Sequence, residues 1–352
     1  MLWSLLLLTA CKGGKDEVVD DTGEPGDTEV TDTDDSSVEE LCEAKPAQLW
    51  PEDEADDHYV RDDIQVLFTK PAAEATFTLK SVVGEESTDL DVTWEFNASD
   101  ELATVDATLL SSTVYVLGID VCDAHYESRF KTSAWGTPLA EDSQSLVDRT
   151  YVVELGDVDF TEPADIGNLL ALYLDVPILL GVREVADDGS EFSMLGAQGF
   201  VDGQGVYRQR KKRTDAEGVK WTVPTWDFEA IDFSETPFFA GDASRIELAY
   251  SGQSIPVHDF HLEATLSEDG LSFGEGRLWG LADTRNLGQV IDSGADDPYA
   301  VVCDLVGGAG IECVPCPDDD EPYCLFLRGE KITGKPVPSL VLERIEEEVE
   351  TQ

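Results

Sequence analysis

The stretch Leu90-Asp-Val-Thr-Trp-Glu-Phe96 alternates apolar and polar side chains along its length. Successive side chains of an extended chain point to opposite faces, so Trp94 and Phe96 share one face and the polar side chains share the other. This period of two predicts a half-buried β-strand. Further strands, separated by Gly, Asn, Asp and Ser, are predicted at Ile64-Gln-Val-Leu-Phe68, Ala75-Thr-Phe-Thr-Leu79 and Val114-Tyr-Val-Leu-Gly-Ile119. Short strands at this spacing indicate a β-sandwich over residues 46–139.

Two motifs within this module carry a resemblance to a known family. Asp63-Ile-Gln-Val-Leu-Phe68, followed by Pro71, and Leu109-Leu-Ser-Ser-Thr-Val-Tyr115 resemble the bacterial immunoglobulin-like domains of surface and cell-wall proteins. Those domains carry a similar F-x-x-P early and an L-x-x-x-T-x-Y late. The resemblance implies an Ig-like sandwich that serves as a spacer or adhesion unit. It also places Tyr115 where a tyrosine closes a corner by bonding its hydroxyl to nearby backbone.

A second module, residues 140–345, is also predicted to be rich in β-strands. Ile178-Leu-Leu-Gly-Val182 and Phe192-Ser-Met-Leu-Gly-Ala197 flank an Asp-Asp-Gly turn and are predicted to form a hairpin. Short helices are expected at residues 165–172, with Asp165 as the N-cap, and at residues 283–291. The predicted fold class is therefore mainly β: an N-terminal Ig-like sandwich, then a second sandwich or barrel-like domain with one or two short helices.

The N-terminal segment contains a lipidation motif. Leu8-Thr9-Ala10-Cys11 follows an apolar run and resembles the lipobox of bacterial lipoproteins. The resemblance implies that residues 1–10 are a signal peptide and that Cys11 is acylated and anchors the chain in a membrane. Residues 11–45 are dominated by Asp, Glu, Thr, Gly and Ser, and are predicted to be a disordered tether. Because Lys12, not an aspartate, follows Cys11, the resemblance favours an outer-membrane lipoprotein, periplasmic or surface-exposed.

The charge balance limits the possible partners. The chain has 75 acidic and 23 basic residues, giving a formal charge of -52. Binding to nucleic acid depends on Lys and Arg that neutralise phosphates, so nucleic acid is not expected as a partner. Envelope polysaccharide or another envelope protein remains a candidate partner. No sequence pattern calls for a cofactor, and residues 346–352 are predicted to be an acidic tail.

Six cysteines remain beyond Cys11, and an even number in an exported chain predicts a disulfide framework. Two of them, Cys42 and Cys122, bracket the first module and are predicted to bridge it. The other four, Cys303, Cys313, Cys316 and Cys324, are predicted to form two local disulfides that clasp residues 303–324 around a solvated acidic turn. Zinc binding and a redox C-x-x-C are the alternatives. Zinc sites usually have two short C-x-x-C pairs, and only one is present here.

Three further patterns suggest sites, and each also has a structural interpretation. The basic run Arg208, Arg210, Lys211, Lys212 and Arg213 could bind an anion, or could pair with the chain's own carboxylates. In His258-Asp-Phe-His261, a spacing of three in a regular strand places the two histidines on opposite faces, so no metal site is predicted. Asp292-Ser-Gly resembles half of an aspartic protease motif, but we interpret it as a loop after a helix.

No catalytic residue can be named from these patterns. We therefore expect a lipid-anchored envelope or surface protein that is not an enzyme and has a structural, adhesive or ligand-binding role. A hydrolase acting on envelope polymers and a carrier of small ligands in the second domain are the alternatives.

Overall fold

About half of the described residues lie in β-strands, as the alternating patterns predict. The computed structural model describes residues 42–164, 176–215, 218–292, 294–346 and 348. The predicted signal peptide, Cys11, most of the predicted tether and the helix predicted at residues 165–172 lie outside the described residues. Residues 43–352 form one compact unit, in which the sandwich comes first along the chain and the second β-domain follows.

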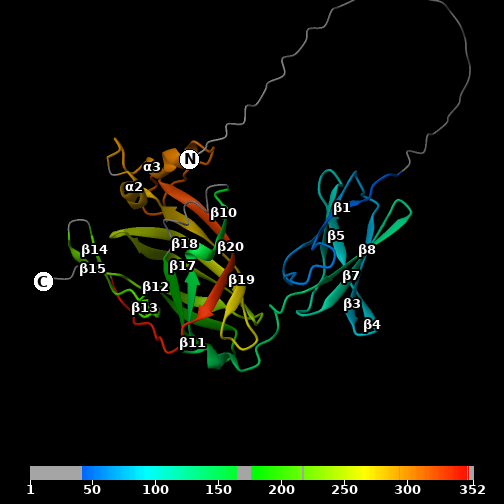
Figure 1. Ribbon diagram of the computed structural model, residues 1–352, viewed down its shortest axis with the longest axis horizontal. Coiled ribbons are helices and arrows are strands. Elements are labelled where there is room, and N and C mark those ends of the chain that lie inside the picture. Colours follow the sequence, from blue (N-terminus) through cyan, green and yellow to red (C-terminus); the bar gives the residue numbers. More distant parts are fainter. Residues whose placement is uncertain (1–41, 165–175, 216–217, 293, 347, 349–352) are drawn as a thin grey trace, which may run out of the picture. The chain divides into compact units, whose positions relative to one another are not determined.

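The first module is a sandwich of two four-stranded antiparallel sheets (Figure 1). One sheet has the order β1-β2-β6-β5, with bounds Pro46–Trp50, Ile64–Phe68, Leu102–Asp106 and Thr93–Phe96. The other has the order β4-β3-β7-β8, with bounds Glu86–Leu90, Thr76–Val83, Val114–Val121 and Ala124–Lys131. The first order corresponds to strands A-B-E-D of an immunoglobulin sandwich, and the second to C-F-G with one added edge strand. The predicted Ig-like sandwich is therefore confirmed.

The sandwich core forms from the side chains that the alternation places inward. On β5, Trp94 and Phe96 turn toward Phe77 of the facing sheet, with ring centroids 5.4 and 6.3 Å away. Tyr115 on β7 is fully buried, and its hydroxyl accepts a hydrogen bond of 2.7 Å from the Leu110 backbone N–H. This is the tyrosine corner that the L-x-x-x-T-x-Y motif predicts. The bond fixes the chain where it enters β7.

Removing the Tyr115 hydroxyl should therefore destabilise the sandwich without changing its fold. We expect Tyr115→Phe to lower the free energy of unfolding by about 1 kcal/mol, the usual net value of one hydrogen bond. The matched control is Tyr126→Phe on β8, because the structure shows no hydrogen bond to the Tyr126 hydroxyl among the described residues. This substitution should change the free energy of unfolding less. Urea unfolding followed by fluorescence measures both. Equal effects of the two substitutions would show that the corner bond does not stabilise the module.

In the second module, eight of the described strands form a closed antiparallel sheet (Figure 1). Their order is β9-β11-β12-β16-β17-β18-β19-β20, and β20 pairs back with β9, so each strand lies beside its neighbour in sequence. The bounds are Thr150–Glu154, Pro177–Val185, Glu191–Val201, Trp226–Asp232, Phe238–Tyr250, Gln253–Leu266, Phe273–Asp283 and Cys324–Pro336. The β-rich domain is thus barrel-like, with up-and-down connections. Short strand β10, Asp159–Glu162, adds to β20, and β13, Tyr207–Gln209, adds to β12.

Large aromatic rings fill the barrel interior beside glycines on the neighbouring strands. The Trp226 indole occupies the space of a missing side chain at Gly196, where an added Cβ would lie 1.9 Å from Nε1. In the same way, an added Cβ at Gly334 would lie 2.1 Å from the Phe273 ring. Trp226 and Phe273 are 5% and 1% exposed. Pairing a ring with a glycine is one way a small barrel packs its interior with side chains.

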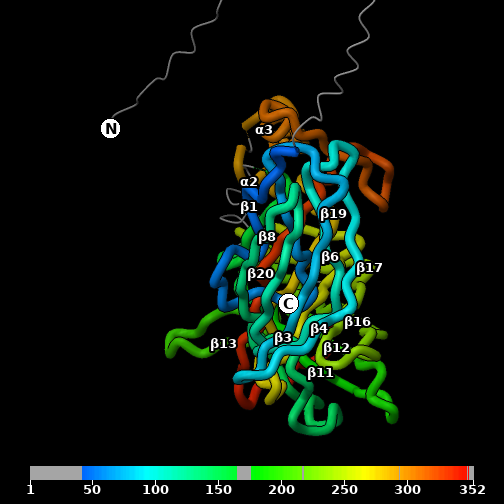
Figure 2. The backbone as a smooth tube through the Cα atoms, turned by 90° about the vertical axis from the view of Figure 1, so that its right-hand side faces the viewer, coloured from blue at the N-terminus to red at the C-terminus, as the bar shows by residue number. Residues whose placement is uncertain are grey.

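Two short helices lie together at one end of the barrel strands. They are α2, Arg285–Ile291, and α3, Val301–Gly307, and both appear at the same end in Figures 1 and 2. Leu287, Val302 and Val306 are buried and belong to the same apolar cluster as the barrel interior. The helices therefore cap this end of the barrel. The helix expected at residues 283–291 is confirmed as α2, and Asp292 follows it as expected, whereas α3 was not predicted.

The chain that follows β20 crosses the outer face of the barrel. Val337 and Leu342 pack with Leu179 and Leu195 in a small apolar cluster on this face. The backbone of this segment also forms hydrogen bonds with side chains of the barrel strands. The Gln209 side chain forms two with the Glu343 backbone, at 2.7 and 2.9 Å. Farther along, the Thr222 hydroxyl donates to the Glu346 carbonyl at 2.6 Å. The described residues of this segment therefore pack along the outer surface of the barrel.

Candidate functional site

Two disulfides join the cap to the barrel rim. Cys303 on α3 pairs with Cys313, and Cys316 pairs with Cys324 at the start of β20, with Cα–Cα distances of 5.7 and 5.0 Å. The two predicted local disulfides are therefore present, and Cys313 and Cys316 do not pair with each other. Cys42 and Cys122 are disulfide-bonded as well. We call residues 303–324 the clasp, and residues 317–321 within it the clasp loop.

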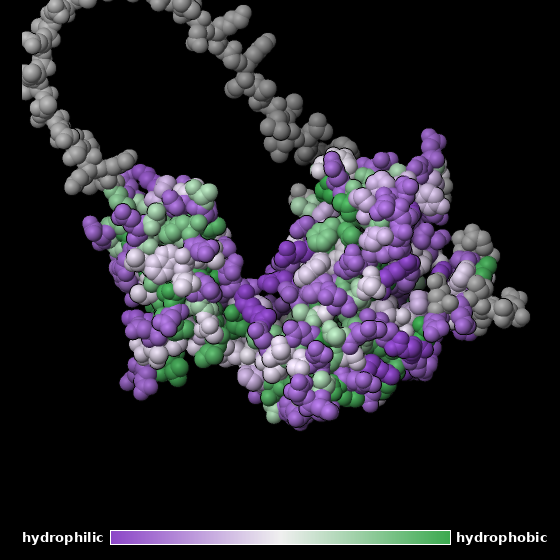
Figure 3. Space-filling view, turned by 180° about the vertical axis from the view of Figure 1, so that it is seen from behind, coloured by the Kyte–Doolittle hydropathy of each residue, from purple (hydrophilic) through white to green (hydrophobic). Residues whose placement is uncertain are grey.

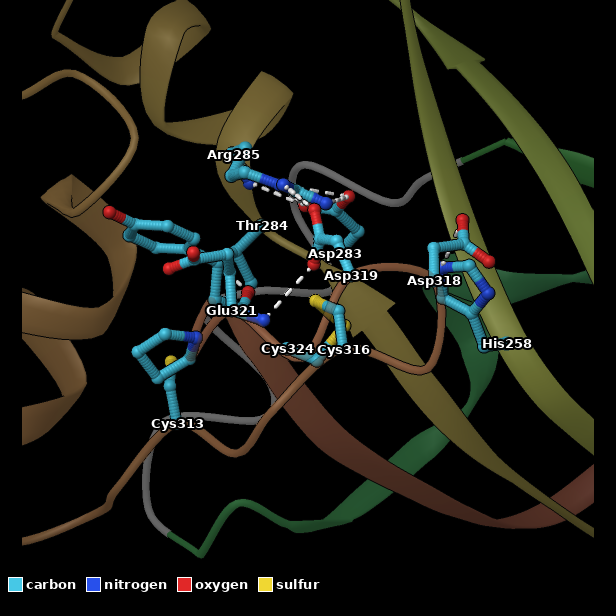
Figure 4. Close-up of a disulfide and its surroundings, with 12 residues drawn as sticks. His258, Asp283, Thr284, Arg285, Cys313, Cys316, Asp318, Asp319, Glu321 and Cys324 are labelled. Carbon is cyan, nitrogen blue, oxygen red and sulfur yellow. Dashed lines mark hydrogen bonds and ion pairs between the residues drawn. A yellow bond between two sulfur atoms is a disulfide. The ribbon is translucent and has the colours of Figure 1, made fainter.

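The clasp loop is exposed, as expected of a solvated acidic turn, and two of its carboxylates also bind arginines of the barrel and the cap (Figure 4). Arg245 on β17 donates from Nη1 to Asp318 Oδ2 at 2.9 Å. Arg285 at the start of α2 donates from Nη1 to Asp319 Oδ2 at 2.5 Å. Sequence reasoning missed both arginines, because they lie 73 and 34 residues from their partners and no local motif marks them.

Arg285 is the centre of the stronger of these two networks. Its guanidinium binds Asp283 through three contacts of 2.7, 2.9 and 3.1 Å, and binds Asp319 through a fourth. The Asp283 side chain is only 10% exposed. The hydrogen bond from Arg285 is the largest cause that lowers the pKa of Asp319, so this carboxyl stays ionised well into the acidic range. Arg285 thus ties α2, the end of β19 and the clasp loop together.

His258 lies beneath the clasp loop because β18 is irregular at Asp259. Asp259 has a left-handed backbone, with φ of 48°, and the register with β19 shifts between His258 and His261. As a result Val257 and Phe260 both face the barrel interior, and both histidines lie on the outer face. The prediction that the two histidines lie on opposite faces was wrong for this reason.

The two histidines have separate surroundings. His261 stacks on Trp279, with centroids 3.9 Å apart, and its Nδ1 lies 2.7 Å from Asp242 Oδ1. The His258 side chain is 3% exposed, and its Nε2 lies 3.6 Å from Asp318 Oδ2 (Figure 4). Among the described residues, no three His, Cys, Asp or Glu side chains gather as metal ligands would.

One cavity in the described part of the barrel interior is small. It measures about 20 Å³, and the lining includes Leu155, Phe160, Ile178, Ile246, Val257 and Phe260. Drug-sized ligands occupy pockets of about 300–1,000 Å³, whereas one water needs about 10–15 Å³. This cavity is therefore too small for such a ligand.

The basic run lies along β13 and a neighbouring hairpin. Lys212 and Arg213 are on β14, Lys212–Thr214, which pairs with β15, Lys220–Thr222. Arg208 bonds Asp202 at 3.0 Å, and Lys211 bonds Glu343 of the C-terminal segment at 2.5 Å. Arg210 lies over the Phe200 ring at 5.4 Å. The chain's own groups therefore engage this run, and anion binding stays a prediction.

Residues 50–65 and the barrel strands line two open clefts of about 570 and 540 Å³. In the larger cleft Glu275 is half-buried, and burial, followed by Asp62 and Asp57, raises the pKa of its carboxyl. Glu275 also has a left-handed backbone, with φ of 50°. Arg277 binds Asp62 at 2.8 Å beside it. Sequence reasoning did not single out Glu275, because its neighbours come from residues far away in the chain.

Comparisons with known proteins do not place the chain in a family. No family model and no curated protein matches it. A DUF4784 family protein from Bacteroides caccae ATCC 43185 is 9% identical, with 69% of this chain and 68% of that chain covered and a TM-score of 0.20. An uncharacterised protein from Listeria monocytogenes EGD-e, solved with glucose, magnesium and calcium, is 8% identical, with a TM-score of 0.18.

A cycloalternan-forming enzyme from Listeria monocytogenes, in complex with a pentasaccharide substrate, is also 8% identical, with a TM-score of 0.18. For each of these two Listeria structures the match covers 64% of this chain but only 20% of the other. At these TM-scores the likeness carries no argument about function. Within the described residues, no helix combines the length and apolar character needed to cross a membrane.

The two arginines that hold the clasp loop should differ in their effect on stability. We expect Arg285→Gln to lower the free energy of unfolding by about 2–3 kcal/mol, because it leaves the buried Asp283 carboxylate without its partner. Arg245→Gln should cost less, because Arg245 and Asp318 are 43% and 49% exposed and Glu247, the other partner of Arg245, keeps its hydrogen bond from Ser254. Urea unfolding measures both. Equal losses would contradict the assignment of Arg285 as the centre of the network.

Glu275 should reduce stability at neutral pH. A carboxyl whose pKa is higher in the folded than in the unfolded state disfavours folding once it is ionised, and this penalty disappears as pH falls below the unfolded value. Glu275→Gln should therefore raise the melting temperature at pH 7 by a few degrees at most and leave it unchanged near pH 4. Glu229 is exposed, so Glu229→Gln is the control and should leave the melting temperature unchanged at both pH values. Differential scanning fluorimetry tests this, and a lower melting temperature of Glu275→Gln at pH 7 would contradict it.

Proposed function

We propose that this chain is a lipid-anchored protein of the bacterial cell envelope that displays two rigid β-modules in a structural or adhesive role. The observation that favours this role over that of a small-ligand carrier is a cavity in the described barrel interior, which measures about 20 Å³ and has room for about one water. A structural or adhesive role acts through the outer surface. In the view of Figure 3 that surface is mainly hydrophilic on the barrel's visible face, which suits a protein displayed in water.

The cysteines support a location outside the cytoplasm. All six cysteines after Cys11 are disulfide-bonded, and disulfides persist in oxidising compartments such as the periplasm and the cell surface. The lipobox Leu8-Thr9-Ala10-Cys11 supplies the proposed anchor, and the acidic residues that follow it supply a self-repelling spacer. Cys11 and this spacer lie outside the described residues, apart from the spacer's last few positions.

Substitution of Cys11 tests the anchor. In bacteria fed an alkyne fatty acid, we expect the wild-type chain to be labelled and to sediment with membranes, because acyl chains hold it there. Cys11→Ala should lose the label and leave the membrane fraction, whereas Lys12→Ala should keep the label. An unlabelled wild-type chain, or a labelled Cys11→Ala chain, would refute lipidation at Cys11.

One observation favours the hydrolase alternative. Glu275 has a raised carboxyl pKa and lines an open cleft of about 570 Å³ together with Asp57 and Asp62. Glycoside hydrolysis uses a carboxyl with a raised pKa near a second carboxyl. Release of reducing ends from purified envelope polysaccharide by the wild-type protein, lost in Glu275→Gln and kept in Glu229→Gln, would favour the hydrolase. No release by the wild-type protein would favour the non-catalytic role.

A further inference from the structure

The open cleft of about 540 Å³ gathers three of the 23 basic side chains of this acidic chain. Its volume lies within the range of about 300–1,000 Å³ that small-molecule sites occupy. Three arginines and two aspartates line it, whereas one lysine and four carboxylates line the neighbouring cleft of about 570 Å³. The lining of the smaller cleft is therefore net positive. It consists of Trp50, Pro51, His58, Arg61, Asp62, Asp63, Gln65, Arg277 and Arg328.

Regular strands place most of these side chains around the cleft. On β19 and β20 of the barrel, Arg277 and Arg328 alternate with buried leucines of the core and therefore project from the outer face. On β1 and β2 of the sandwich, Trp50 and Gln65 lie opposite each other in the strand pairing. Arg61 comes from the segment that connects these two strands. Residues far apart in the sequence thus line one cleft, so no local motif marks it.

Arg328 is the arginine of this cleft with the most remaining capacity to bind a ligand. Among the described residues its one ion pair, to a carboxylate two residues along β20, is 3.5 Å long, and its buried Nε has no hydrogen-bond partner. By contrast, Arg277 binds Asp62 at 2.8 Å and Arg61 binds Glu235. A guanidinium has five N–H donors, and the Arg328 side chain is 41% exposed. Its Nη donors can therefore bind a carboxylate that enters the cleft.

The other side chains of the cleft favour an acid that also carries hydroxyl groups. Asp63 and Gln65 can form hydrogen bonds with hydroxyls, whereas the Asp63 carboxylate repels a bare anion. Trp50 is 38% exposed, so its indole offers an apolar face to a ligand. A sugar ring with a carboxylate combines these properties, because it has an apolar face, several hydroxyls and one negative charge.

We infer that this cleft binds a carboxylate-bearing saccharide, such as a uronic-acid unit of an acidic polysaccharide, with the carboxylate on Arg328 and the sugar ring beside Trp50. A guanidinium can bind a carboxylate through two parallel N–H···O bonds. The chain's charge of -52 repels an anionic ligand at a distance, but salt at about 0.15 M screens exposed charges that are more than about 8 Å apart. This inference names a ligand for the adhesive role and rests on that proposed function.

Calorimetric titration of the purified full-length protein with trigalacturonate tests the site. At about 0.15 M salt, we expect saturable binding of trigalacturonate and weaker binding of its neutral counterpart, galactotriose, and of inorganic phosphate. Arg328→Gln should weaken binding of trigalacturonate by about tenfold, because it removes a charged hydrogen bond. Absence of trigalacturonate binding, or equal affinity for phosphate, would overturn the inference.

Arg208→Gln on the basic run is the matched control and should keep the wild-type affinity. If Arg208→Gln loses binding and Arg328→Gln keeps it, the ligand binds the basic run and the cleft is wrong. If Arg328→Gln does not fold, Arg328→Lys decides, because lysine keeps the charge but cannot bind a carboxylate through two parallel bonds. Labelling at Cys11 is measured separately: a labelled chain that does not bind refutes the cleft alone, and an unlabelled chain that binds refutes the anchor alone.

Discussion

The pairing of β20 with β9 is the constraint on which the second module depends. Lys335 and Pro336 lie opposite Val152 and Tyr151, so the last strand completes the sheet that the first one begins. Closure leaves no open edge along the sheet and encloses an interior that rings and glycines then fill. It also fixes where the other elements lie. A closed barrel exposes its apolar interior only at its ends, and at one of them Leu287, Val302 and Val306 bring the cap helices into the same core.

The cap is too short to hold itself in place, because α2 and α3 have seven residues each and isolated helices of that length are marginal in water. Disulfides and ion pairs hold the two helices and the clasp loop in place. The pair Cys303–Cys313 fixes α3, Cys316–Cys324 fixes the clasp loop to β20, and Arg285 joins the loop to α2 and Asp283. The acidic loop, which is exposed as the sequence predicts, is therefore also a structural part of the rim.

Local sequence patterns predicted the features that depend on residues close together in the chain. They did not predict the features that depend on contacts between distant residues. Alternation such as that around Trp94 predicted the strands, L-x-x-x-T-x-Y predicted the Tyr115 corner, and cysteine spacing predicted the two local disulfides. The sequence left a sandwich and a barrel-like domain open for the second module, because the pairing of β9 with β20 that closes the barrel spans most of the module. The outward position of His258 was missed because a single left-handed residue, Asp259, shifts the period of two by one position.

The excess of acidic residues explains why the few arginines have so much effect. With 23 basic against 75 acidic residues, every cation has several possible carboxylate partners, and pairing it across distant segments also relieves repulsion between them. Arg344 binds Asp227 across 117 residues, Arg277 binds Asp62 across 215, and Arg285 joins two aspartates at once. Exposed pairs of this kind contribute little singly. The pair of Arg285 and Asp283 at the clasp differs because the Asp283 carboxyl is largely buried, so water screens its charge less.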